Sequence, residues 1–400
     1  MEVINKLVVL IACVLVLVSC DDIAEDASLN TIGLIQKYGY NAENHRVVTS
    51  DGYVLGVHRI SGGPLSPPAA GKPVAFLQHG MLSSSADYVL MGPHVSLGYM
   101  LSDLGYDVWM GNARGNRYSN THITKDNSTE DYWDFSWHEV GIYDLPAMID
   151  YVLLETRQAR LHYIGHSQGT TAYFVLMSEL PNYGNKIISS QLLAPAAYMH
   201  NVKSPYVIWL ATYLYSVEAM YEASGTYYFA PTNEMDIAGG LEDCKDGAPD
   251  QDMCTMTIFL IAGFNSQEMN MTMLPVIKGH SPAGASVKQM LHHAQTVRSW
   301  IFRQYDFGNL NYYRYGQLLP PNYRFNGHTA PLAFYHSLND WMATPNDVNL
   351  LASQVNNIQL KYLVPQTKFN HMDFVWAINV RSLVYNRLVE DMAKWNLSRG

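Results

Sequence analysis

Short apolar runs alternate with amphipathic stretches along both halves of the chain. Residues 47–60 alternate apolar and polar side chains around Asp51-Gly52, a dipeptide that favours a β-hairpin turn. Compact apolar runs at 74–77, 106–110, 162–164, 187–193, 332–335 and 360–364 predict buried strands. Helical periods at 138–156, 170–180 and 380–395 fall between or after them. This alternation predicts an α/β fold, with a mostly parallel sheet covered by helices on both faces.

The alternation of strands and helices stops between residues 198 and 321. This segment is rich in Tyr, Met, Leu and Ile, shows helical periods and is too long to be a loop. It predicts a mainly helical cap inserted between the two parts of an α/β core, at 21–197 and 322–400. A cap in this place could open and close over a site, and a rigid packed subdomain is the alternative.

The first 20 residues differ from the rest of the chain. Lys6 precedes an apolar run at 7–18, which ends at Ser19-Cys20 and is short for a bilayer span. We expect a signal peptide over residues 1–20, and a bacterial lipoprotein box at 17–20 is the alternative. Since no later segment has eighteen unbroken apolar residues, we expect a soluble mature protein.

Composition narrows the classes of function. The chain has 400 residues, of which 48% are hydrophobic, and a net charge of −10 with an isoelectric point near 5.8. The large apolar fraction argues against disorder. The acidic charge argues against a nucleic-acid partner, which would require a basic face. No obligate protein partner is evident from the sequence.

The cysteines and several asparagines agree with secretion. Cys244 and Cys254 are the two cysteines beyond the predicted signal peptide. In an oxidising compartment they would pair, and two free thiols are the alternative. Three Asn-x-Ser/Thr triplets, beginning at Asn127, Asn270 and Asn396, are candidate glycosylation acceptors.

The predicted strand at 162–164 leads into a turn with the sequence Gly165-His166-Ser167-Gln168-Gly169, and a helical stretch follows. A strand, Gly-x-Ser-x-Gly and a helix together form a nucleophile elbow, whose sharp turn lifts the serine hydroxyl out of the sheet. Glycines flank the serine because side chains there would collide with the neighbouring strand and helix. We therefore expect Ser167 to be a nucleophile, and an ordinary surface turn is the alternative.

A serine nucleophile needs a base, and the base needs an acid to orient it. In α/β-hydrolases they follow in the order serine, acid, histidine. Asp340 lies in the loop after the strand at 332–335, whereas its rival Asp347 lies where a helix is expected to start. His371 follows the strand at 360–364, whereas His328 and His336 come too early. The sequence predicts Asp340 as the acid and His371 as the base.

An oxyanion hole needs two backbone N–H groups. Gln168 follows the nucleophile, and Met81 lies in the loop after the strand at 74–77, so we expect these two residues to supply them. His79 in that loop is an alternative catalytic histidine. No metal or cofactor motif is present, and His292-His293 is interpreted as the polar face of a cap helix.

Several motifs recur in an order typical of one family. They are TSDGY at 49–53, LQHG at 77–80, DVWMGN at 107–112, RGN at 114–116, GHSQGTT at 165–171 and NHMDF at 370–374. From about Thr31 to Trp395 the chain resembles the animal acid lipases, the group that includes lysosomal acid lipase and gastric lipase.

The resemblance implies an α/β-hydrolase core, a cap with a mobile lid and hydrolysis of neutral lipid esters. It places the family's functional residues on the positions already named: Ser167, Asp340, His371, Met81, Gln168 and the disulfide pair Cys244 and Cys254. Two departures are visible. A further cap cysteine of some relatives is replaced near Ala262, and Trp341 is bulkier than the residue that relatives tend to carry beside the acid.

These observations together predict a secreted or lysosomal lipase without a cofactor. Its expected partners are neutral lipid esters, triacylglycerols or steryl esters, with transient contact with a lipid interface. The alternatives are a non-catalytic lipid-binding or storage protein on a lipase scaffold, and an esterase for small soluble esters. Retention of all three triad residues disfavours the first alternative, and the large apolar cap disfavours the second.

Overall fold

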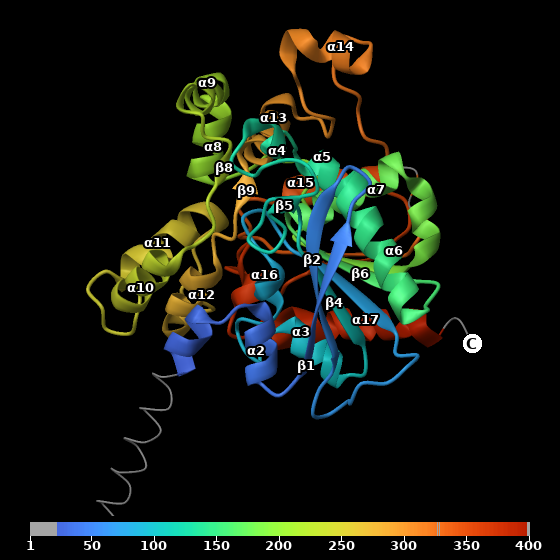
Figure 1. Ribbon diagram of the computed structural model, residues 1–400, viewed down its shortest axis with the longest axis vertical. Helices are drawn as coiled ribbons and strands as arrows, with labels where there is room; N and C mark the ends of the chain where they lie inside the picture. The colour runs from blue at the N-terminus through green and yellow to red at the C-terminus, as the bar shows by residue number, and fades with distance from the viewer. Residues whose placement is uncertain (1–21, 326, 328, 398–400) are drawn as a thin grey trace, which may run out of the picture.

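The computed structural model describes residues 22–325, 327 and 329–397 (Figure 1). The signal peptide expected at 1–20 lies outside the described residues. None of the helices that the structure describes is long and apolar enough to cross a lipid bilayer.

A central sheet organises the described residues. Its strands are β1 Asn41–Val48, β2 Tyr53–Gly62, β3 Val74–Gln78, β4 Asp107–Gly111, β5 Thr121–His122, β6 Leu161–His166, β7 Ile187–Leu193, β10 Leu332–His336 and β11 Ile358–Leu363. They lie in the order β1-β2-β4-β3-β6-β7-β10-β11, with β5 added beside β2. The β1–β2 hairpin is antiparallel, and all pairs from β4 to β11 are parallel. The predicted hairpin and the mostly parallel sheet are therefore confirmed.

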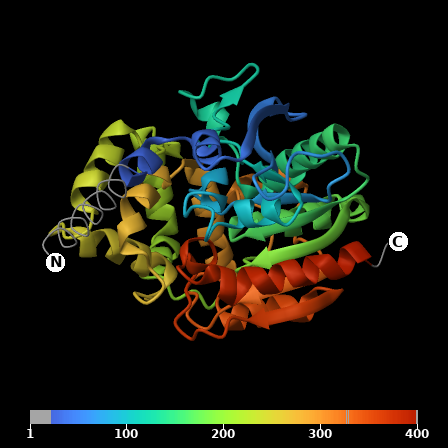
Figure 2. The ribbon, with the colours of Figure 1, turned by 90° about the horizontal axis from the view of Figure 1, so that it is seen from below.

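Helices cover both faces of this sheet, as the alternation predicted (Figures 1 and 2). Outside the predicted cap they are α2 Thr31–Lys37, α3 Leu97–Asp103, α4 Glu130–Trp133, α5 Trp137–Glu139, α6 Leu145–Thr156, α7 Gln168–Glu179, α15 Pro345–Gln354, α16 Asp373–Trp376 and α17 Asn386–Leu397. The faces that pack on the sheet are apolar, and strands β3, β4 and β6 are buried along their whole length.

The helix predicted at 138–156 is divided into α5, a π-helical turn at Val140–Asp144, and α6. Pro146 lies at the start of α6, where its missing N–H removes one bond of a regular helix. The wider turn places the Asp144 carboxylate against Arg114, whose Nε lies 2.7 Å from Asp144 Oδ1. The continuous apolar pattern gave no sign of this interruption.

The segment 198–321 is mainly helical, as expected. It contains α8 Pro205–Thr212, α9 Leu214–Ser224, α10 Glu234–Asp243, α11 Gln251–Ala262, α12 Leu274–His280, α13 Val287–Ser299 and α14 Asn311–Tyr315. Two short strands, β8 Tyr228–Phe229 and β9 Ala285–Ser286, pair with each other. In Figure 1 these elements lie to the left of the sheet and above it, and α9 and α14 extend away from the body.

The interpretation of His292-His293 as a polar helix face is wrong. His292 is buried and stacks on Trp137 of α5, with ring centroids 3.6 Å apart. Its Nδ1 lies 3.0 Å from Ser136 Oγ, and its Nε2 donates to Arg303 O at 3.0 Å. A pair of histidines in the sequence indicates a polar position, but the flat imidazole ring can also stack on aromatic side chains in a core. Helix α13 is therefore tied to the α/β core.

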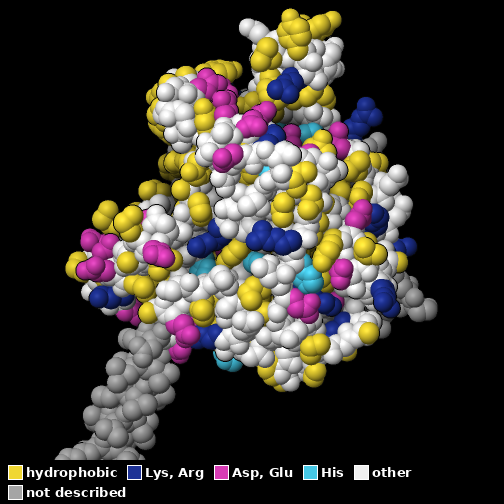
Figure 3. Space-filling view, in the orientation of Figure 1, with side chains coloured by type: hydrophobic (Ala, Val, Ile, Leu, Met, Phe, Trp, Pro, Cys, Tyr) yellow, Lys and Arg dark blue, Asp and Glu magenta, His cyan; other side chains and the backbone are white. Residues whose placement is uncertain are grey.

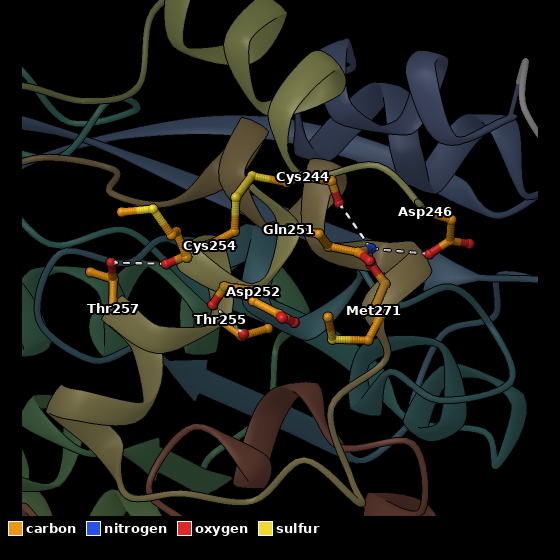
Figure 4. The surroundings of a disulfide bond; sticks show 9 residues. Cys244, Asp246, Gln251, Asp252, Cys254, Thr255, Thr257 and Met271 are labelled. Carbon is orange, nitrogen blue, oxygen red and sulfur yellow. Dashed lines mark hydrogen bonds between the residues drawn. A yellow bond between two sulfur atoms is a disulfide. The ribbon is translucent and has the colours of Figure 1, made fainter. Parts of the chain in front are cut away.

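The structure contains the expected disulfide between Cys244 and Cys254, at the turn that joins α10 to α11 (Figure 4). Gln251 supports the same turn, since its Nε2 donates to Cys244 O at 3.2 Å and to Asp246 Oδ1 at 3.1 Å. The disulfide and the Gln251 hydrogen bonds together fix the connection between α10 and α11.

The three candidate glycosylation sites differ in exposure. Asn127 is exposed and Asn270 is half-buried. The Asn396 amide nitrogen donates to the Tyr106 hydroxyl at 3.0 Å, and its Oδ1 lies 2.8 Å from His162 Nε2. The Asn127 amide nitrogen also donates a hydrogen bond, to Asn120 O at 2.8 Å, so exposure alone makes Asn127 the most accessible acceptor of the three.

Candidate active site

Ser167 occupies a sharp turn between β6 and α7. Its φ angle of 52° and ψ angle of −121° are strained for a residue with a side chain. The neighbouring glycines make the turn possible: a Cβ on Gly169 would collide with Gln78 O, and one on Gly165 would lie 3.0 Å from the Gly169 carbonyl carbon. The sequence context therefore predicted the local geometry of the elbow correctly.

Three side chains from separate loops form a continuous hydrogen-bonded chain. Ser167 Oγ lies 2.7 Å from His371 Nε2. On the other side of the ring, His371 Nδ1 lies 2.9 Å from Asp340 Oδ2 and 3.0 Å from Asp340 Oδ1. In this arrangement a histidine can take the hydroxyl proton while the carboxylate fixes its tautomer.

The Asp340 carboxylate is fully buried and held by its own loop. Its Oδ1 accepts hydrogen bonds from the backbone N–H groups of Met342 at 2.8 Å and Ala343 at 2.7 Å. Asp347 has a different environment at the start of α15. Its carboxylate accepts from the backbone and side-chain nitrogens of Asn201, each at 2.8 Å. The structure thus brings Asp340, and not Asp347, to His371.

The loop that carries His371 is anchored from two directions. His166 donates through Nε2 to His371 O at 3.0 Å, and the His371 N–H donates to Ala262 O at 3.3 Å. Asp373 Oδ2 accepts from the Asn370 N–H at 2.7 Å, and burial raises the pKa of Asp373 to about 7. The contact with Ala262, at the end of helix α11, was not predicted, because no pattern in the sequence links two segments so far apart.

The two expected oxyanion donors lie beside Ser167. Gln78 at the end of β3 is paired with Gly165 of β6, so the loop containing Met81 begins next to the elbow. A Cβ on Gly80 would lie only 3.1 Å from Ser167 Cβ. Gln168 is the first residue of α7, where a backbone N–H has no acceptor within the helix.

His79 is occupied in shaping this loop. Its Nδ1 donates to Gly80 O at 2.7 Å, and its Nε2 accepts from the Ala113 N–H at 3.0 Å. This pattern requires a neutral ring, and burial lowers the pKa of His79 to about 4. Both ring nitrogens are engaged, so the geometry supports a structural role for His79. His336 is buried in β10, and His328 lies outside the described residues.

A cavity of about 140 Å³ opens over Ser167 and His371. Its walls are mostly apolar and come from both the sheet-bearing core and the segment 198–321: Met199, Leu210, Ile261, Met290 and Met342. Trp341 does not belong to this lining and packs instead against Phe264, with ring centroids 5.4 Å apart. An apolar cavity over a nucleophile is suited to a hydrocarbon chain.

Asp87 is a buried carboxyl in the lining of the same cavity. It accepts hydrogen bonds from the Ser83 hydroxyl and, at 3.2 Å, from Trp376 Nε1. Burial raises its pKa to about 6. Asp87 was not predicted as a site residue, because a lone aspartate carries no recognisable pattern in the sequence. In the part of the chain that the structure describes, no three His, Cys, Asp or Glu side chains are arranged to hold a metal ion.

Comparison with known proteins agrees with this geometry. Residues 31–92 match the family described as "Partial alpha/beta-hydrolase lipase region", and residues 73–232 match "alpha/beta hydrolase fold". A solved structure, a soluble variant of monoglyceride lipase from Saccharomyces cerevisiae in complex with a substrate analog, is 15% identical with a TM-score of 0.54. It covers 90% of this chain and 97% of its own. That likeness supports the fold.

Three relatives in sequence are similar over most of their lengths. Lipase 3 of Drosophila melanogaster is 46% identical over 90% of this chain and 92% of the relative. Gastric triacylglycerol lipase of Rattus norvegicus is 37% identical, over 92% and 93%. Lysosomal acid lipase/cholesteryl ester hydrolase of Homo sapiens is 35% identical, over 92% of each chain. The chain therefore belongs to the lipase family of α/β-hydrolases that includes the gastric lipases and lysosomal acid lipase.

Proposed function

We propose that Ser167, His371 and Asp340 are the catalytic triad through which this lipase-family enzyme hydrolyses carboxylic esters. The observation that carries the proposal is the hydrogen-bonded chain from Ser167 Oγ through both nitrogens of His371 to the buried Asp340. A carboxylate held by two backbone N–H groups cannot turn away from the ring, so it keeps the proton on Nδ1 and leaves Nε2 free as the base.

In this mechanism Ser167 Oγ attacks the ester carbonyl carbon while His371 Nε2 takes its proton. The negative charge that develops on the carbonyl oxygen is stabilised by the N–H groups of Met81 and Gln168. His371 then gives the proton to the departing alcohol, which leaves an acyl ester on Ser167. Water, deprotonated by His371, attacks this acyl-enzyme and releases the fatty acid.

The proposed substrates are neutral lipid esters, triacylglycerols or steryl esters. Relatives bear the names gastric triacylglycerol lipase and lysosomal acid lipase/cholesteryl ester hydrolase. The apolar walls of the cavity support a long acyl chain as ligand. The mechanism uses side chains and backbone groups of this chain and water, with no cofactor.

Contact with a lipid interface is the second part of the proposal. Large apolar side chains are exposed on the segment 198–321, among them Trp209 of α8 and Tyr313 of α14. Figure 3 shows hydrophobic side chains over the region of α8 and at the tip that carries α14. We propose that this segment is the cap and that part of it opens at lipid. Helix α13 belongs to its fixed part, because His292 stacks on Trp137 of the core.

A location in the secretory pathway, either extracellular or lysosomal, also belongs to this proposal. Two features support it: the relatives include enzymes named gastric and lysosomal, and the Cys244–Cys254 disulfide is typical of an oxidising compartment.

The test is hydrolysis by purified protein of emulsified triolein, emulsified cholesteryl oleate and dissolved p-nitrophenyl butyrate. We expect turnover of at least one emulsion by the wild type, and complete loss on every ester in Ser167→Ala with an unchanged melting temperature. Turnover of p-nitrophenyl butyrate alone would favour a small-molecule esterase. Absence of turnover on all three, with tight binding of the lipids, would favour a lipid-binding protein.

A further inference from the structure

The side chain of Gln168 is held at both ends by helix α13. Its Nε2 donates to Gln289 Oε1 at 2.6 Å, and its Oε1 accepts from His293 Nε2 at 3.0 Å. Gln289 and His293 are four residues apart, so they lie on one face of the helix. Gln168 and Gln289 are buried, with 4% and 2% of their surface exposed. We refer to Gln168, Gln289 and His293 as the amide clamp.

The helix that supplies two members of the clamp is itself anchored at its start and near its middle. Ser286 Oγ, at the start of α13, donates to Phe135 O at 2.7 Å, and His292 stacks on Trp137. These contacts join α13 to the α4–α5 region of the core. Gln168 is thus fixed to a helix that is bound directly to the core.

The backbone next to the clamp is strained. Ser167 has a φ angle of 52°, and the Gln168 N–H belongs to the peptide bond that follows this residue. A strained conformation persists only where the surrounding structure holds it. The side-chain bonds of Gln168 restrain the first turn of α7, and with it the direction of the Gln168 N–H.

We propose that Gln289 and His293 are positioning residues, which hold Gln168 so that its backbone N–H points at the developing oxyanion. The inference rests on the proposed function, since it assigns a task only if the Gln168 N–H stabilises that charge. Such donors act because they are already oriented before the charge forms. A misplacement of about 1 Å in a reacting geometry can cost about 100-fold in rate. The clamp therefore acts mainly on the transition state and only weakly on binding of the ester.

The test uses Gln168→Met, which keeps the backbone N–H and the length of the side chain but removes both hydrogen bonds. We expect kcat on p-nitrophenyl butyrate to fall about 10- to 100-fold with little change in KM, the pattern of a lost transition-state interaction. Binding of a boronic acid that mimics the tetrahedral intermediate should weaken by a similar factor. His293→Phe should lower kcat in the same direction, and adding it to Gln168→Met should have little further effect, because the two share one interaction.

A matched control lies on the same helix. The Gln295 amide also makes two hydrogen bonds: its Nε2 donates to Asp306 O at 2.9 Å, and its Oε1 accepts from the Asp306 N–H at 2.8 Å. Gln295→Met removes as many bonds from α13, but none at the elbow. We expect it to lower the melting temperature and to leave kcat and boronic acid binding unchanged.

The outcomes separate this inference from the proposed function. A Gln168→Met enzyme with unchanged kcat, or with a change confined to KM, would overturn the positioning role even if Ser167→Ala is inactive. Equal losses of kcat in Gln168→Met and Gln295→Met would also overturn it, because the effect would then be general destabilisation. If Gln168→Met does not fold, Gln289→Leu and His293→Phe provide the same comparison. Full activity of Ser167→Ala would instead refute the proposed function itself.

Discussion

Replacing Asp340 with asparagine should disable His371 without removing any of its neighbours. In the wild type, Asp340 Oδ1 accepts from the N–H groups of Met342 and Ala343, and Oδ2 lies 2.9 Å from His371 Nδ1. In Asp340→Asn the amide oxygen must stay with the two backbone donors, so the NH₂ group takes the place of Oδ2. A donor then faces Nδ1, which becomes an acceptor, and the ring proton moves to Nε2.

The consequence for catalysis follows from the position of that proton. His371 Nε2 lies 2.7 Å from Ser167 Oγ and, once protonated, cannot accept the serine proton. Loss of the correct tautomer in a serine triad costs about 10⁴ in kcat. That factor corresponds to about 5 kcal/mol in the barrier. Because the side chains have the same shape, we expect little change in KM.

The measurement is steady-state hydrolysis of p-nitrophenyl butyrate, with Asp347→Asn as the matched control. Asp347 is also a buried aspartate with two backbone or side-chain nitrogen donors, but it faces Asn201 and lies in the first turn of α15. We expect Asp347→Asn to lose stability, by about 1–3 kcal/mol, and to keep its kcat. If Asp347→Asn proves the more damaging change to kcat, or if Asp340→Asn retains wild-type turnover, the assignment of the acid is wrong.

Three further predictions concern stability and the cap. Burial raises the pKa of Asp87 to about 6, so the protonated carboxyl stabilises the fold at low pH and this stabilisation is lost as the pH rises through 6. The unfolding free energy of Asp87→Asn should therefore rise by up to about 3 kcal/mol relative to that of the wild type between about pH 4 and pH 7. A difference in unfolding free energy between Asp87→Asn and wild type that stays the same at every pH, measured by denaturant titration, would contradict this. Replacing Cys244 and Cys254 by serine should cost about 2–3 kcal/mol, and mapping of unreduced peptides should show the linked pair in wild type, whereas two alkylatable thiols would refute it. If the cap contacts lipid, Trp209→Ser, at a side chain that is 48% exposed, should slow hydrolysis of emulsified triolein but not of dissolved ester. The control Leu154→Ser, at a side chain that is 75% exposed on α6, should slow neither reaction. Equal effects of the two variants would indicate that the cap has no role at the interface.

The strands and the elbow could be predicted because their information is local. The run Ile187–Leu193 is a strand with those same limits, since an apolar run bounded by turns has few other ways to bury itself. Ser167 was predicted from the flanking Gly165 and Gly169, which approach α7 and β3 so closely that a side chain at either position would collide. The three loops that carry the proposed triad follow from the order of strands in an α/β sheet.

What the sequence could not supply are contacts between segments far apart in the chain. The bond from the His371 N–H to Ala262 O and the clamp on Gln168 join core loops to cap helices. His293 was interpreted as a polar surface residue, because one sequence shows the polarity of a side chain but not its partner. The π-helical turn before α6 was missed for a similar reason, since the buried Arg114 that Asp144 contacts lies 30 residues earlier.

The central claim is that Ser167 is the nucleophile of an ester hydrolase, and covalent labelling tests it most directly. The native protein would be treated with a fluorophosphonate, which reacts with activated serines, and the adduct located by peptide mass mapping while residual hydrolysis is followed. We predict one adduct per chain, on Ser167, with hydrolysis lost in proportion to labelling and neither adduct nor activity in Ser167→Ala. An adduct on another residue, or full hydrolysis by protein labelled at Ser167, would contradict the account.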